Sequence, residues 1–175
     1  MNITIYQSEF SSRTDYDISA PACDYGVQKK LLSSGEEFQL TSGDRRGVVA
    51  KIRSRGSSFR ARFDIELSDG GILHFQRESP WRGVFGCQGG PESFHLCEHR
   101  GLKFSVFRNG LQIAAFTKNR VQIGKGYRYD IRMNQDANSV LVTCLVLVAG
   151  AMNYEDADAA SGSEARPFDE AWEPS

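Results

Sequence analysis

The sequence predicts an all-β barrel of about twelve strands that encloses one apolar α-helix near the C-terminal end. Short stretches of alternating apolar and polar residues recur from residue 2 to residue 132, at the spacing of roughly 8–12 residues that is typical of barrels and sandwiches. The 17 glycines and 11 phenylalanines also favour a turn-rich β protein. The uncharged residues 139–152 follow the strands, and a helix that is apolar on every side must be enclosed by other elements. A closed barrel of this size needs such a filling.

The first half of the barrel is expected between residues 2 and 77. Its clearest strand is residues 59–67, in which every second side chain from Phe59 to Leu67 is apolar, as a half-buried strand requires. Asp69 and Gly70 follow, and this pair suits the positive φ angles of a tight hairpin. Strands are expected at residues 2–7, 16–18, 25–32, 37–41, 48–53, 59–67 and 72–77.

The second half of the barrel is expected between residues 84 and 132. Asn109 and Gly110 separate two apolar-rich stretches and are a strong hairpin signal. Strands are expected at residues 84–87, 93–99, 102–108, 111–117, 121–123 and 127–132, with the last two of these as a pair.

The uncharged residues 139–152 are interpreted as a buried helix that spans residues 138–153. Asp136 or Asn138 is a suitable N-cap, and fourteen residues are long for one strand. The alternative is one or two buried strands, because valine is abundant here and strands favour β-branched residues. The stretch is too short to span a bilayer, which needs ~20 apolar residues.

The 175 residues suit one domain with a substantial core. We divide the chain into an N-terminal strand with a polar lead-in (1–24), the barrel with its helix (25–156) and an acidic, flexible tail (157–175). Residues 155–175 contain seven acids and one base, a charge of −6. The total charge of −1 leaves +5 for the other 154 residues, so the tail either lies across a basic face or is solvated.

The expected location is the cytoplasm, where the protein is either free or bound at the surface of a membrane. The first five residues contain neither the basic nor the apolar region of a signal peptide. The four cysteines are scattered, and without an export signal we interpret them as reduced thiols. No transmembrane segment and no cofactor are expected, and the sequence does not indicate an oligomeric state.

Two parts of the chain resemble the LURP-one-related proteins. The opening carries Leu31-Leu32-Ser33-Ser34-Gly35-Glu36-Glu37-Phe38-Gln39-Leu40, then a turn and Val48-Val49-Ala50-Lys51-Ile52. The ending carries Tyr127-Arg128-Tyr129-Asp130-Ile131, then Asn134-Gln135-Asp136-Ala137-Asn138-Ser139-Val140-Leu141 and the apolar stretch. The resemblance covers roughly residues 25–156. Since LURP-one-related proteins are similar in fold to the tubby C-terminal domain and the phospholipid scramblases, it implies a closed twelve-stranded barrel around a central C-terminal helix.

The chain departs from those relatives at their functional positions. Tubby domains bind phosphoinositide head groups through a Lys/Arg pair on the outside of the barrel, and we assign no matching pair here. Scramblases have an acidic calcium-binding segment next to the terminal helix. The corresponding segment here offers only Asp130 and Asp136, too few carboxylates for a dedicated calcium site.

A group of seven cations is the candidate ligand-binding surface. No acid lies between Asp44 and Asp64, and on strands the cations of this stretch share faces. Such a group suits an anionic lipid head group or another phosphorylated ligand; nucleic acid is not expected, because no aromatic residues alternate with the cations. The alternative is a solvated outer face of the barrel. The seven residues are Arg45, Arg46, Lys51, Arg53, Arg55, Arg60 and Arg62.

Two further groups suggest chemistry. His95, Cys97 and His99 share one face of a predicted strand, but three such positions span ~13 Å from end to end, too far for one zinc ion. An ordinary strand face is the preferred interpretation, and no metal site is predicted. Cys87 with His95 or His99 is the candidate for a thiol–imidazole pair.

The leading hypothesis is a non-enzymatic binding or scaffold module, with no catalytic residues, whose barrel surface meets an anionic lipid, a phosphorylated ligand or a protein. One alternative is a hydrolase or redox enzyme that uses Cys87 with a histidine. Another is an interaction adaptor that uses the acidic tail, in which Phe168 and Trp172 lie among acids as in a docking peptide.

Overall fold

The chain forms a closed antiparallel β-barrel around one helix, as the sequence predicts. The computed structural model describes residues 1–10, 13–19, 25–32, 35–43, 47–55, 62–79, 82–87, 91–121, 126–151 and 167–175. Twelve strands and one helix lie in these ranges. They are β1 (Asn2–Phe10), β2 (Arg13–Ser19), β3 (Tyr25–Leu32), β4 (Gly35–Ser42), β5 (Val48–Arg55), β6 (Arg62–Leu67), β7 (Ile72–Ser79), β8 (Arg82–Cys87), β9 (Phe94–His99), β10 (Lys103–Arg108), β11 (Leu111–Val121), β12 (Gly126–Met133) and α1 (Ser139–Ala151).

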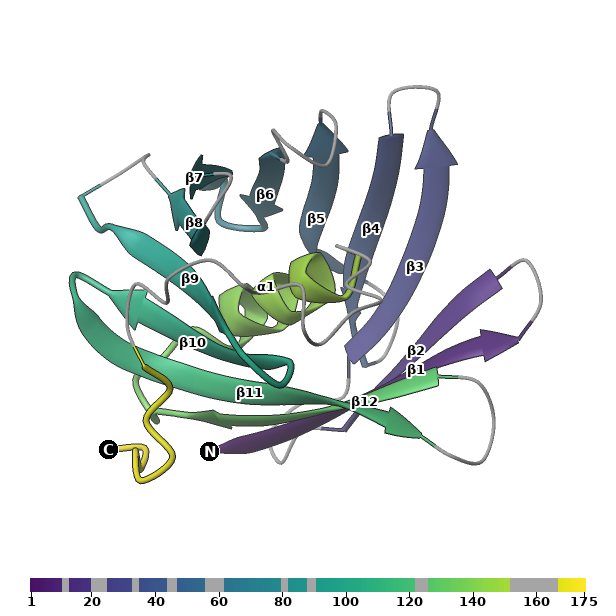
Figure 1. Ribbon diagram of the computed structural model, residues 1–175. Helices are drawn as coiled ribbons and strands as arrows, with labels where there is room; N and C mark the ends of the chain where they lie inside the picture. Colours follow the sequence, from purple (N-terminus) through teal and green to yellow (C-terminus); the bar gives the residue numbers. More distant parts are fainter. Residues whose placement is uncertain are drawn as a thin grey trace.

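Each strand pairs with its neighbours in the sequence, and β1 closes the barrel by pairing with both β2 and β12. Figure 1 shows the strands around α1. Ile5 of β1 lies opposite Tyr129 on one side and Ile18 on the other. The described residues before β3 therefore supply two strands of the barrel, β1 and β2, including the one that closes it.

The helix α1 fills the barrel. Asn138 is its N-cap: the side-chain Oδ1 accepts a hydrogen bond from the Leu141 amide at 3.1 Å, and its carbonyl accepts one from the Val142 amide at 3.0 Å. Every residue from 141 to 150 is buried, because the inner faces of the strands surround the helix. The helical interpretation is confirmed; the helix begins one residue later than expected, and residues 152 and 153 lie outside the described ranges.

Apolar side chains at alternate strand positions form the core around the helix. In β6, Phe63 and Ile65 are buried, as predicted from their alternation, whereas Phe59 and Ala61 lie outside the described residues. Phe104 and Phe116 stack with ring centroids 4.7 Å apart. One continuous cluster joins these strand side chains to those of α1, so the interior is a packed core in the described part of the chain.

Both hairpins expected from residue pairs are present. Gly70 has a φ of +86° between β6 and β7, and Asn109 and Gly110 have φ values of +51° and +81° between β10 and β11. At Asn109–Gly110 both central residues have positive φ, which is the type I′ geometry that matches the twist of paired strands. At Asp69–Gly70 only the glycine has positive φ.

One expected break is wrong, because β11 continues from Leu111 to Val121 as a single strand. The polar residues Lys118, Asn119 and Arg120 are typical of a loop in the sequence. In the structure Lys118 points into the barrel, where it is 4% exposed and its Nζ lies 4.0 Å from the centroid of the Tyr127 ring. The face of the Tyr127 ring stabilises the Lys118 ammonium. The pairing of β11 with β12 therefore continues through Lys118, Asn119 and Arg120.

Candidate functional site

The predicted group of seven cations is only partly described. Arg45, Arg46 and Arg60 lie outside the described residues, and the side chain of Arg55 is not described either. The other three, Lys51, Arg53 and Arg62, lie on the outer faces of β5 and β6, since they alternate with the core residues of those strands.

Carboxylates on the neighbouring strands lie close to two of the three described cations of this group. Arg53 Nε donates to Glu37 Oε2 at 2.8 Å, and Arg53 Nη1 lies 3.7 Å from Glu66 Oε2. The hydrogen bond and the charge of Glu37 raise the pKa of Arg53 above its usual value. Lys51 lies opposite Glu66, and Arg53 lies opposite Asp64. Two of the three described cations, Lys51 and Arg53, thus face acids on the neighbouring strands, whereas Arg62 lies opposite Arg55 and Gln76.

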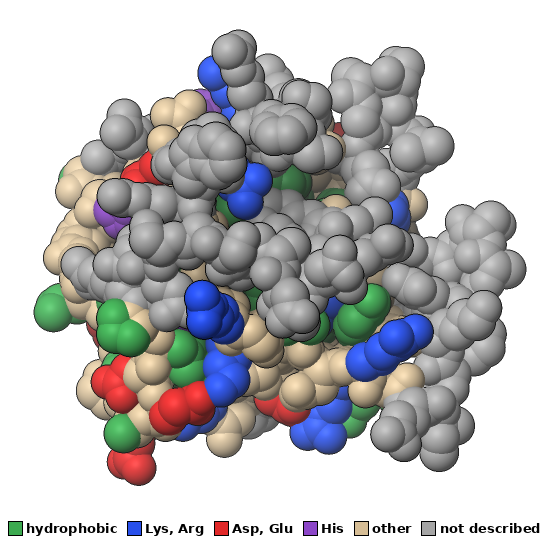
Figure 2. Space-filling model, viewed as in Figure 1, with side chains coloured by type: hydrophobic (Ala, Val, Ile, Leu, Met, Phe, Trp, Pro, Cys, Tyr) green, Lys and Arg blue, Asp and Glu red, His purple; other side chains and the backbone are tan. Residues whose placement is uncertain are grey.

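A second group of cations lies on the outer face of β10 and β12. Lys103, Arg128 and Arg132 alternate with the buried residues Phe104, Tyr129 and Ile131, so their side chains point outward. Figure 2 shows Lys and Arg side chains across the lower part of the described surface, where β10–β12 lie. We name Lys103, Arg128 and Arg132 the basic face.

One carboxylate opposes these cations on the described strands β10–β12. Arg128 donates to Asp130 Oδ1 through Nε at 2.8 Å and approaches it through Nη2 at 2.7 Å, which raises the pKa of Arg128. Asn119 also donates to Asp130, at 3.1 Å. Sequence reasoning missed the basic face, although the alternation of residues 127–132 places Arg128 and Arg132 on one side of a strand.

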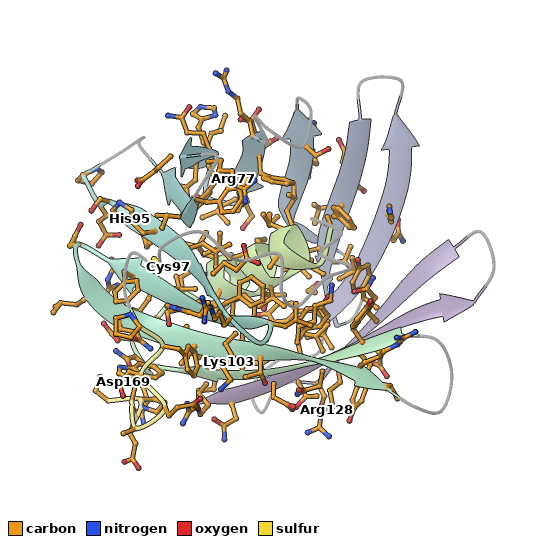
Figure 3. All side chains as sticks on the ribbon, viewed as in Figure 1. Arg77, His95, Cys97, Lys103, Arg128 and Asp169 are labelled. Carbon is orange, nitrogen blue, oxygen red and sulfur yellow. The ribbon has the colours of Figure 1, made fainter. Side chains whose placement is uncertain are left out.

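The C-terminal segment Pro167–Ser175 lies beside the basic face and holds one of its cations. Lys103 forms an ion pair with Glu170. Its Nζ also lies 5.3 Å from the centroid of the Phe168 ring, which packs edge-on against the His99 ring at a centroid distance of 5.3 Å. Figure 3 shows Lys103 on β10 and Asp169 in the neighbouring segment. This end of the tail contacts the barrel; residues 152–166 lie outside the described ranges.

The three residues considered for a metal site have separate partners. His95 Nε2 lies 3.2 Å from Glu78 Oε1, and His99 Nε2 lies 3.0 Å from Ser105 Oγ. Cys97 belongs to a small apolar cluster with Val84 and Phe107 on the outer side of the wall. Within the described ranges, no three His, Cys, Asp or Glu residues are arranged to hold a metal ion.

The barrel wall separates Cys87 from the histidines considered with it. Cys87 is in the central core cluster, whereas His95 and His99 point to the outer side of β9. Burial raises the pKa of the Cys87 thiol, and it raises that of Cys144 in the helix further. Both cysteines are therefore protonated and enclosed, which is the opposite of what a nucleophilic thiolate needs. Cys23 lies outside the described residues.

Comparison with known proteins identifies no relative. No family model, no curated protein and no solved structure matches the chain. Among the described residues, no helix has both the length and the apolar character needed to cross a bilayer.

Proposed function

We propose that this protein is a non-enzymatic binding module that holds a phosphate-bearing ligand on the basic face of its barrel. The observation that carries the proposal is the pair formed by Lys103 and Glu170: this face already holds an anionic group, supplied by the chain itself. Arg128 and Arg132 extend the face, and β10–β12 oppose them with one described acid, Asp130.

Electrostatics sets the strength expected of this binding. A cation near an anionic lipid surface contributes ~1 kcal/mol, and the total is small here because Asp130 and Glu170 already pair with two of the three cations of the basic face. Binding of that size is weak and falls with added salt, because exposed charges are screened beyond about 10 Å at 0.1 M ionic strength. A phosphoinositide, with several phosphate groups in one head group, suits the face better than a singly charged lipid.

The architecture favours binding over catalysis. The barrel interior is filled by α1, and the wall separates Cys87 from His95 and His99. A barrel closed around an apolar helix is also what the resemblance to the LURP-one-related proteins implies, and we propose membership of that tubby-like group. A cytoplasmic protein that meets a membrane peripherally fits this proposal.

Vesicle co-sedimentation at low salt tests the proposal. The samples are neutral vesicles, phosphatidylserine vesicles and phosphoinositide vesicles, each with wild type and two double variants. Arg128→Ala with Arg132→Ala removes two cations of the basic face. Lys51→Ala with Arg62→Ala is the matched control, because it removes the same charge from β5 and β6.

We expect binding that requires anionic lipid, that falls at least tenfold in the basic-face variant and that persists in the control. A water-soluble inositol trisphosphate that competes with the vesicles would assign the affinity to the head group rather than to the membrane. Equal loss in both variants would indicate a general effect of charge, and no binding of the wild type at low salt would refute the proposal.

A further inference from the structure

We propose that the outer face of β9 and β10 is a docking site for a short acidic peptide with an aromatic side chain, contributed by a partner protein. The C-terminal segment Pro167–Ser175 is the occupant that the chain supplies itself. This inference goes beyond the proposed function. The two proposals share Lys103, but the peptide site adds His99 and does not use Arg128 or Arg132, so each can fail without the other.

The occupant defines the chemistry that the site accepts. Phe168 contacts both the His99 ring and the Lys103 ammonium, and Glu170, two residues later, pairs with the same lysine. The Phe168 ring and the Glu170 carboxylate therefore contact the same Lys103 ammonium. The ammonium is attracted to the face of the ring and to the negative charge of the carboxylate.

The segment is also held in shape and position by hydrogen bonds. Asp169 Oδ1 accepts from the Ala171 amide at 3.0 Å, which forms a local turn between Phe168 and Trp172. The Ser175 amide donates to Asn134 Oδ1 at 3.0 Å, and the Gln135 amide donates to the Ser175 carbonyl at 3.1 Å. The turn keeps the aromatic ring and the carboxylate on the same lysine, and Ser175 fixes the far end near the start of α1.

The outer face of the barrel under the C-terminal segment has buried side chains. Outward-pointing residues of β5 and β6 include Lys51, Arg53 and Asp64, all of which are at least partly exposed. Several outward-pointing residues of β8–β10 are instead buried. These residues are Val84, Cys97, His99, Ser105 and Phe107. A soluble protein does not need buried side chains on the outside of a barrel unless another segment covers them, and Phe168 lies on one of them, His99.

The contacts of the C-terminal segment with the barrel are weak enough for another peptide to replace the segment. The Glu170 side chain is 67% exposed, and an exposed ion pair contributes little to stability. The segment holds its place mainly because it belongs to the same chain, which gives it an effective concentration on the order of millimolar. A partner peptide with the same chemistry therefore competes when its own contacts are stronger or when the C-terminal segment is weakened.

The test uses the full-length protein and a synthetic peptide of residues 167–175, with backbone amide chemical shifts as the readout. Phe168→Ala with Glu170→Ala in the full chain weakens its own segment and opens the face. Titration of the peptide is expected to shift the His99, Lys103 and Ser105 amides saturably in this variant. The wild-type chain is expected to bind the peptide at least tenfold more weakly, because its own segment competes.

Two controls make the interpretation specific. A peptide with the same composition in scrambled order should bind at least tenfold more weakly. Lys103→Glu in the opened variant should abolish binding of the peptide. A peptide with Glu170→Lys should bind the Lys103→Glu protein but not the opened variant that keeps Lys103, because the two charges are exchanged.

Three results would overturn the proposal. One is an opened variant that keeps its folded spectrum but shows no shifts with peptide. Another is equal binding of the scrambled peptide, which would indicate only general attraction of acids. The third is a response of His99 and Lys103 to anionic vesicles and not to peptide, which would make this face part of a lipid surface. None of these depends on the Arg128 and Arg132 result, so the two proposals fail separately.

Discussion

At the scale of single residues, close contacts inside the barrel explain which substitutions the fold tolerates. The C-terminal end of α1 lies against the β1–β12 wall, where Tyr129 donates from its hydroxyl to Gln7 Oε1 at 2.7 Å. A Cβ at Gly150 would lie 2.7 Å from that hydroxyl oxygen. The glycine therefore serves a packing need, because its own propensity opposes the helix in which it lies.

Gly150→Ala is expected to destabilise the protein, although alanine is favoured over glycine in an exposed helix by about 1 kcal/mol. The added methyl group must displace the rigid Tyr129 ring or break its bond to Gln7, and overpacking of this kind costs roughly 1–3 kcal/mol. Chemical unfolding measures the effect. In a Tyr129→Phe background the loss caused by Gly150→Ala should shrink; a loss of the same size there would mean that the hydroxyl is not the obstacle.

The buried thiols predict how stability changes at alkaline pH. Burial raises the pKa of Cys144 above its ordinary value of 9.0, so the unfolded chain ionises first as the pH rises. The stabilisation from the protonated thiol is thus complete below pH 9 and declines above it, by about 1.4 kcal/mol per pH unit for one such group.

Unfolding measurements from pH 8 to pH 10.5 on wild type and Cys144→Ala test this prediction. The free energy of unfolding should fall less steeply above pH 9 in the variant, because one titrating thiol has been removed. The comparison of slopes cancels the tyrosines and lysines that titrate in both proteins. Parallel curves would contradict a buried, protonated Cys144.

At the scale of elements, alternation along strands and apolar character around the helix determine the fold. The hairpins at Gly70 and at Asn109–Gly110 were predictable because their backbone angles require particular residues. The helix was predictable because residues 141–150 have no polar side and are all buried. The full length of β11 was not, since the burial of Lys118 depends on Tyr127, a residue of another strand.

The central helix gives the sharpest prediction at this scale. Leu145 is completely buried in the core, whereas Leu111 at the start of β11 is 75% exposed. Leu145→Asp is expected to abolish folding, as is Val142→Asp, because an unpaired charge in the core has no compensating partner. Leu111→Asp, the matched control, should remain folded with its stability within about 0.5 kcal/mol of wild type.

Far-ultraviolet circular dichroism and thermal melting distinguish these outcomes. A Leu145→Asp protein that stayed soluble and melted at the wild-type temperature would exclude α1 from the core.

At the scale of the whole molecule, the barrel separates an unreactive interior from a charged exterior. Cys87 and Cys144 lie inside, and the described cations of both groups lie outside. The fold class could be predicted from sequence, because it depends on patterns within each element. The candidate site could not, because its electrostatics depend on which strands become neighbours. Arg53 belongs to a stretch without acids in the sequence, yet Glu37 and Glu66 meet it from both adjacent strands.

The same reasoning accounts for the C-terminal segment. Its acids were expected either to be solvated or to lie across a basic face, and only the folded chain brings Glu170 to Lys103, 67 residues away in sequence. The termini also meet the same part of the barrel, since the Met1 amino group donates to the Met133 carbonyl and Ser175 bonds to Asn134. The segment thus has a defined place, which its composition alone did not predict.

The most direct test of the central claim, that the basic face of the barrel binds a phosphate-bearing ligand, is a map of amide chemical shifts on titration with soluble inositol trisphosphate at low salt. Saturable changes are expected at Arg128 and Arg132 of β12 and at Lys103 of β10, with β5 and β6 unaffected. Changes confined to Lys51 and Arg62, or no saturable change anywhere on the barrel, would contradict it.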